Sequence, residues 1–143
     1  MPEFQSFWSQ TDRKRLSDHI TSEVEKLAPG NGFVCFVRPE SSFAGDTSLV
    51  HSKGQERGGS AWLRESMAGQ PFGYNELIKT AIHELAHRLA YQADPYHDDD
   101  VDPAFKDIEA TLVRLARRLD IWPKPAVPAE VSDIRGLNVG ASR

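Results

Sequence analysis

The sequence predicts an α+β domain that consists of an N-terminal helix, a small mixed sheet of about three strands, a central helix and a C-terminal helix. Apolar residues recur at three- and four-residue spacing in three separate stretches, which is typical of helices that bury one face. Between the first and second stretches lie short runs rich in β-branched and aromatic residues, as expected of strands. With 143 residues, the chain is expected to form one domain with its core at about residues 11–120.

The N-terminal helix is expected to begin at Thr11-Asp12, where a side chain can cap the first turn, and to end at Ala28. The sequence Pro-Gly-Asn-Gly follows and predicts a turn. The apolar stripe of this helix consists of Leu16, Ile20, Val24 and Leu27. His19 lies beside the stripe and is expected on the surface.

Three strands are expected before the central helix. Residues 32–39 form an apolar run bounded by glycine and proline, which predicts a buried strand. Residues 47–51 and 60–66 are predicted as the second and third strands, and the charged, Gly-rich residues 52–59 as a loop between them. A turn at residues 67–73 then leads into the central helix.

The central helix is predicted at residues 74–92, and it contains the sequence His83-Glu84-Leu85-Ala86-His87, which is H-E-x-x-H. At ~100° per residue, the two histidines lie about 40° apart around the axis and one turn apart along it. Two imidazoles so placed can bind one Zn²⁺, and Glu84 can reach a metal-bound water. The alternative is a solvated helix face without a ligand. Apolar neighbours such as Ile82 argue against it, because they bring the histidines to a buried margin.

The C-terminal helix is expected from Asp102-Pro103, a capping carboxylate followed by proline, to about Asp120. An acidic loop, in which Pro95 blocks helix continuation, separates it from the central helix. Residues 121–143 are proline-rich and predict an extended tail, held along the domain by Ile121 and Trp122.

A catalytic zinc usually has three protein ligands, so one must come from outside the central helix. His97 is the first candidate, because Pro95 turns the intervening loop back toward the helix. Glu109 on the C-terminal helix is the second, and would give a His₂Glu site. The carboxylates of the acidic run that includes Asp98 follow, as ligands or as groups that orient an imidazole. Cys35 comes last, since its apolar strand favours core packing.

This motif, on a helix preceded by strands, resembles the zincin metallopeptidases. The segment from His97 to Ala104-Phe105, which leads into a C-terminal helix, looks like the small SprT-like and WLM-like branches, in which a downstream histidine is the third ligand. The match covers roughly residues 33–119, and only H-E-x-x-H is specific. The metzincin pattern G-x-x-H is absent at His97, no glycine follows it, and the segment around Cys35 lacks the cysteine motif of peptide deformylases.

The predicted activity is zinc-dependent hydrolysis of an amide bond in a peptide or protein substrate, with Glu84 as general base. If residues 60–66 form an exposed edge strand, an extended peptide could add to it. Candidates for donors to the oxyanion are Tyr91, Tyr96, His51 and Arg88.

Two other functions fit the same motif. The protein could be a non-catalytic, zinc-stabilised binding or regulatory module, although a purely structural site does not need Glu84. It could also be a metallohydrolase of a non-peptide substrate. A DNA-associated protease is suggested by the resemblance alone, and the net charge of −4 argues against nucleic-acid binding through bulk charge. The best candidates for a local basic strip are Arg114, Arg117 and Arg118.

Composition also predicts the compartment. The lone cysteine cannot form an internal disulfide, and the N-terminus lacks the basic and apolar regions of a secretory signal. No apolar run reaches the ~20 residues of a membrane span. We therefore expect a cytoplasmic protein without membrane contact; the sequence does not specify its oligomeric state.

Overall fold

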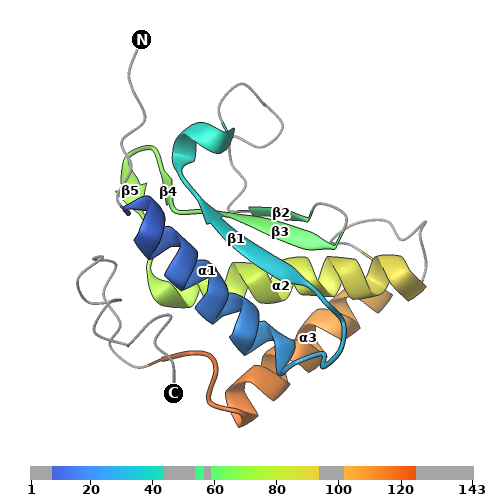
Figure 1. Ribbon diagram of the computed structural model, residues 1–143. Helices are drawn as coiled ribbons and strands as arrows, with labels where there is room; N and C mark the ends of the chain where they lie inside the picture. Colours follow the sequence, from blue (N-terminus) through green and yellow to red (C-terminus); the bar gives the residue numbers. More distant parts are fainter. Residues whose placement is uncertain (1–7, 44–53, 57–58, 94–101, 125–143) are drawn as a thin grey trace.

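The fold is described from a computed structural model of the chain, for residues 8–43, 54–56, 59–93 and 102–124 (Figure 1). Within these residues, three α-helices, one short 3-10 helix and five strands form a mixed α+β fold, as predicted. Helices α1 and α2 cover one face of a three-stranded sheet, and α3 packs against α2 (Figure 1).

Helix α1 spans Gln10–Glu25 and begins earlier than predicted. Its N-cap is Ser9, not Thr11 or Asp12, because the Ser9 hydroxyl accepts the backbone N–H of Asp12 at 3.1 Å. The predicted apolar stripe is buried and consists of Leu16, Ile20, Val24 and Leu27.

His19 was predicted to lie on the surface, but it is partly buried. Its side chain is only 22% exposed, and its Nε2 lies 2.7 Å from the hydroxyl of Tyr74 at the start of α2. Burial lowers the pKa of His19, although Glu23 acts in the opposite direction. The contact joins residues 55 positions apart, so local spacing within α1 could not reveal it.

The sheet has the order β1-β3-β2. Strand β1 (Val34–Arg38) pairs in parallel with β3 (Ser60–Arg64), and β2 (Gly54–Glu56) pairs antiparallel with the other side of β3. The first and third predicted strands are therefore present, but β3 is the central strand, so residues 60–66 do not provide the exposed edge that addition of a peptide there would require. The predicted strand at 47–51 lies outside the described residues.

Strand β2 falls in the segment that was predicted to be a loop. Gly54 allows this strand to lie close to both β3 and α2, because a Cβ there would be 2.8 Å from the Trp62 carbonyl oxygen of β3 and 3.0 Å from Thr80 Cγ2 of α2. The glycine that indicated a loop in the sequence thus permits a close approach between an edge strand and a helix.

Residues 67–73 were predicted as a simple turn, but they include part of a hairpin. Strands β4 (Ser66–Met67) and β5 (Gln70–Pro71) form a two-stranded hairpin there. Its two central residues, Ala68 and Gly69, both have positive φ, at 52° and 79°, as a type I′ turn requires.

The outer edge of β1 is covered by hydroxyl groups of α1. The Ser17 hydroxyl accepts the Val37 backbone N–H at 2.8 Å, and the Thr21 hydroxyl accepts the Cys35 N–H at 2.9 Å. The Thr21 hydroxyl also donates to the Cys35 carbonyl at 3.2 Å. These bonds occupy backbone groups that an exposed edge would offer to an added strand.

Helix α2 spans Tyr74–Ala93 and α3 spans Pro103–Arg118, so both predicted helices are present. Asp102 caps α3 as predicted, accepting the Ala104 backbone N–H at 2.8 Å. Residues 121–124 lie against the start of α2, where Asn75 bonds the backbone of Lys124 through both its side-chain atoms and accepts the Trp122 indole N–H on its carbonyl. This agrees with the predicted start of the tail; residues 125–143 lie outside the described part.

In the part of the chain that the structure describes, no helix combines the length and the apolar character that a membrane span requires.

Candidate metal centre

Helix α2 brings the two histidines of the H-E-x-x-H sequence together on the side that faces α3. Both side chains are partly buried, and their ring centroids lie 4.7 Å apart at an interplanar angle of 87°. The Nε2 atoms of His83 and His87 are 3.1 Å apart. The apolar residues of α2 that pack into the core fix this orientation, because they determine which side of the helix remains for the imidazoles.

Glu109 on α3 holds the opposite nitrogen of the first imidazole. Its Oε2 lies 2.6 Å from His83 Nδ1, with the two side chains 27% and 32% exposed. A carboxylate in this position accepts the Nδ1–H, which leaves the lone pair of His83 on Nε2. In the described structure, Glu109 therefore contacts the nitrogen that points away from His87.

Phe105 on α3 forms an apolar wall beside both imidazoles. Its ring stacks on His87 at 4.2 Å between centroids and 23° between planes, and meets His83 edge-on at 5.2 Å. Phe105 itself is 1% exposed. The ring limits the rotation of the two imidazoles and excludes water from one side of the pair.

Glu84 lies on the sheet-facing side of α2 and is 5% exposed. It is close enough to Cys35 on β1 for its charge to influence the thiol: burial, together with the Glu84 carboxylate, raises the pKa of Cys35 to about 12. The thiol thus remains protonated at neutral pH. Glu84 directly follows His83 in the sequence, and a buried carboxylate of this kind is a candidate proton acceptor.

The histidine pair fits a zinc ion in the distances that the structure provides. The two Nε2 atoms are hydrogen-bonded to each other at 3.1 Å, and nitrogens this close could both hold one Zn²⁺ at ~2.0–2.1 Å. The carboxylate on His83 Nδ1 completes a carboxylate–histidine pair of the kind that metal sites use to orient a ligand. Within the described ranges, no group of three or more His, Cys, Asp or Glu side chains is placed to hold a metal ion.

The remaining predicted site residues are distributed as follows. His97, Tyr96, Asp98 and His51 lie outside the described residues. Tyr91 lies on α2 one turn beyond His87 and is 52% exposed. Arg88 lies on α2 near Gly59, the residue that precedes β3. Cys35 is buried in the core, as its apolar strand predicted.

Two contributions to the site were missed by reasoning from the sequence. Glu109 was considered as a ligand, whereas it contacts His83 Nδ1, and Phe105 was considered as part of the segment that resembles the SprT-like and WLM-like branches. Both residues lie on α3 four positions apart, and therefore on the same face of that helix. The sequence shows that Phe105 and Glu109 share one face of α3, but it does not show which side of α2 that face packs against.

Comparison with known proteins adds no relative: no family model, no curated protein and no solved structure matches this chain.

Proposed function

We propose that this protein is a zinc-dependent hydrolase of the zincin type that cleaves amide bonds in peptides or proteins. The observation that carries the proposal is the pair of Nε2 atoms at 3.1 Å, with Glu109 on the far nitrogen of His83. His83 and His87 would hold the zinc through Nε2, and His97 is the proposed third ligand. Glu109 remains the alternative third ligand.

When bound, zinc lowers the pKa of a coordinated water toward ~7 and polarises the scissile carbonyl. Glu109 keeps His83 in the tautomer whose Nε2 carries a lone pair, and Phe105 keeps both rings in place. Glu84 then accepts one proton of the attacking water as the oxygen bonds to the carbonyl carbon. The same carboxyl group returns that proton to the amine nitrogen as the C–N bond breaks.

We propose that an extended substrate binds at the edge of the sheet formed by β2. Strand β2 is the outer strand beside β3 and packs against α2, the helix that carries the histidines. The opposite edge, β1, has its backbone N–H groups at Cys35 and Val37 bonded to hydroxyls of α1. A peptide that adds a strand is therefore proposed to pair with β2, not with residues 60–66. Tyr91, exposed one turn past His87, is a candidate donor to the oxyanion.

The decisive comparison is between the wild-type chain and Glu84→Gln, both loaded with zinc, on a mixed pool of unfolded proteins. New N-termini are identified by mass spectrometry. General-base catalysis is worth ~10²–10⁴-fold in rate, so the variant should retain zinc and lose nearly all cleavage.

Equal cleavage by both proteins would exclude Glu84 as the base. If neither cleaves the pool while both bind zinc, the second function applies: a zinc-stabilised binding or regulatory module without turnover. A metallohydrolase of a non-peptide substrate would instead show Glu84-dependent hydrolysis of small ester or amide substrates alone.

A further inference from the structure

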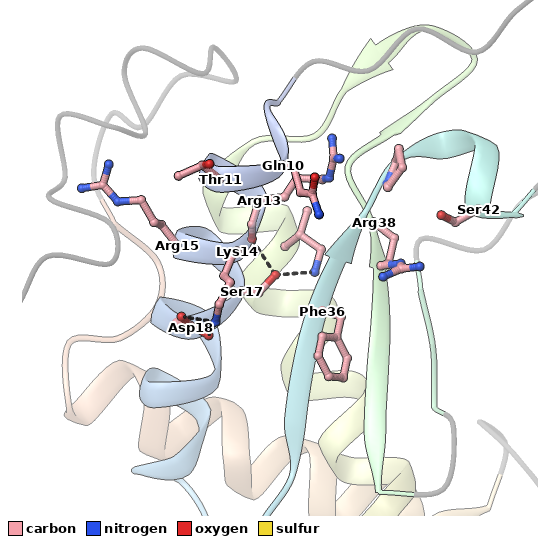
Figure 2. A pocket seen from close by; sticks show the side chains of 12 residues that line it. Gln10, Thr11, Arg13, Lys14, Arg15, Ser17, Asp18, Phe36, Arg38 and Ser42 are labelled. Carbon is pink, nitrogen blue, oxygen red and sulfur yellow. Dashed lines mark hydrogen bonds and ion pairs between the residues drawn. The ribbon is translucent and has the colours of Figure 1, made fainter.

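A groove of about 810 Å³ runs between the N-terminal half of α1 and strand β1, at the opposite edge of the sheet from β2 (Figure 2). Lys14 lies on its helix side and Phe36 and Arg38 on its strand side, while the Arg15 side chain extends from α1 away from β1 (Figure 2). Its volume is within the ~300–1,000 Å³ of ordinary ligand pockets. The histidine pair lies on the α3 side of α2, so the two sites use different elements.

The groove is positively charged in a chain that is acidic overall. Four basic side chains and one acidic side chain, Asp18, line it, whereas the whole chain carries a net charge of −4. Lys14 pairs with Asp18 at 3.1 Å, and Arg13 lies 3.6 Å from the buried carboxylate of Glu65. Arg15 and Arg38 are exposed, and among the described residues neither forms an ion pair. The complementary occupant is therefore anionic.

The backbone of β1 does not favour recognition by strand addition. Ser17, which also lines the groove, already accepts the Val37 N–H, and Thr21 bonds Cys35 in the same way. An occupant must therefore be recognised by side chains. Besides the charges, the groove offers apolar contacts: Phe36 is 40% exposed, and Pro39, which follows the end of β1, also lines the groove.

The aromatic residues distinguish an acidic peptide from a nucleic acid. Single-stranded nucleic acids bind by stacking successive bases on several exposed rings. Here one half-exposed ring, Phe36, lines the groove. The neighbouring ring of Trp62 is covered by the Arg38 guanidinium at 4.7 Å and contacted edge-on by Phe43 at 6.3 Å. The single Phe36 ring, with basic side chains nearby, is complementary to a peptide in which carboxylates flank one apolar side chain.

We propose that this groove is a docking site for a partner-protein segment in which acidic residues flank an apolar or aromatic side chain. Arg38 binds one carboxylate and Arg15, on the other side of α1, binds another, while Phe36 contacts the apolar side chain. The site does not require the zinc centre, so it remains even if the proposed hydrolase activity is wrong.

The test uses the full chain and fluorescence anisotropy with three fluorescein-labelled probes. One is a twelve-residue peptide in which glutamate alternates with leucine and phenylalanine. The second has lysine in place of every glutamate, and the third is a twelve-nucleotide oligo-dT. The acidic peptide should bind saturably, and more weakly as salt rises from about 50 to 300 mM, while the lysine peptide should not bind.

The double variant Arg15→Glu/Arg38→Glu should weaken binding of the acidic peptide by about tenfold or more. The matched control Arg114→Glu/Arg118→Glu reverses two exposed arginines on α3 and changes the net charge equally, so it should weaken binding by less than about twofold. Phe36→Ser should also weaken binding, whereas Leu119→Ser, at another exposed apolar residue, should not. Circular dichroism verifies that each variant is folded.

Three results would overturn the proposal. The first is the absence of saturable binding by the acidic peptide, and the second is equal weakening by the groove variant and its α3 control. The third is tighter binding of oligo-dT than of the acidic peptide, which would assign the groove to nucleic acid.

Discussion

Removing the carboxylate of Glu109 should weaken zinc binding without abolishing it. In the structure this carboxylate lies 2.6 Å from His83 Nδ1, so it would act on a zinc ion held by His83 through the imidazole. Loss of such a partner typically costs 10–100-fold in metal affinity, or about 1.4–2.7 kcal/mol. Glu109→Ala should show a loss of this size, because His83 then rotates more freely and either tautomer becomes accessible.

The matched control is Asp107→Ala, which removes an exposed carboxylate from the same helix. Zinc affinity is measured by competition with a chromophoric chelator at fixed pH, for wild type, both α3 variants, His83→Ala and His97→Ala. His83→Ala and His97→Ala should lose far more affinity than Glu109→Ala.

Two results would refute this reasoning in different ways. If Glu109→Ala binds zinc as tightly as Asp107→Ala, the carboxylate does not orient the ligand. If Glu109→Ala loses as much affinity as His83→Ala while His97→Ala retains zinc, the site is His₂Glu, and Glu109 is itself a ligand.

Three further predictions concern the scaffold. Gly54→Ala should lower stability by ~1–3 kcal/mol and reduce cleavage of extended peptides, since the new Cβ would lie 2.8 Å from the Trp62 carbonyl oxygen; unchanged thermal unfolding would contradict this. Ser17→Ala should cost ~1–3 kcal/mol in urea denaturation, because the buried Val37 N–H loses its acceptor; a cost near zero would mean that water replaces the hydroxyl. The lowered pKa of His19 means that the folded state binds this proton less tightly than the unfolded chain. Its contribution to the free energy of unfolding is therefore complete above pH 6.5 and is lost as the pH falls from there to the pKa in the folded state. His19→Gln should make the free energy of unfolding depend less steeply on pH between about pH 5 and 7, and an unchanged pH dependence would exclude a contribution from His19.

The helices were predictable because their signals are local. The apolar stripes of α1, α2 and α3 repeat within each segment, and Asp102-Pro103 marks the start of α3. The exceptions show where local reasoning ends. Ser9 precedes the pattern that was read as a helix start, so the better cap was overlooked.

The sheet was predictable in content but not in order. Spacing along the chain cannot show that β3 runs between β1 and β2, since pairing depends on contacts between distant residues. Strand β2 was hidden because Gly54 resembles a loop residue, although it is what permits the close approach to α2.

At the candidate site, the one-turn separation of His83 and His87 follows directly from their spacing in a helix. The role of Glu109 does not, because it depends on how α3 crosses α2. The groove beside β1 was missed for a similar reason. Its cations come from two elements, whereas the expected basic strip at Arg114, Arg117 and Arg118 was sought along one helix.

The most direct test of the central claim is the metal content of the purified protein, measured by plasma emission spectrometry before and after reconstitution with zinc. The proposed zinc site predicts one equivalent of zinc per chain in wild type and a severe loss in His83→Ala and His87→Ala, while Asp107→Ala retains it. Wild-type protein that contains no zinc after mild purification, and takes up none on reconstitution, would contradict the account.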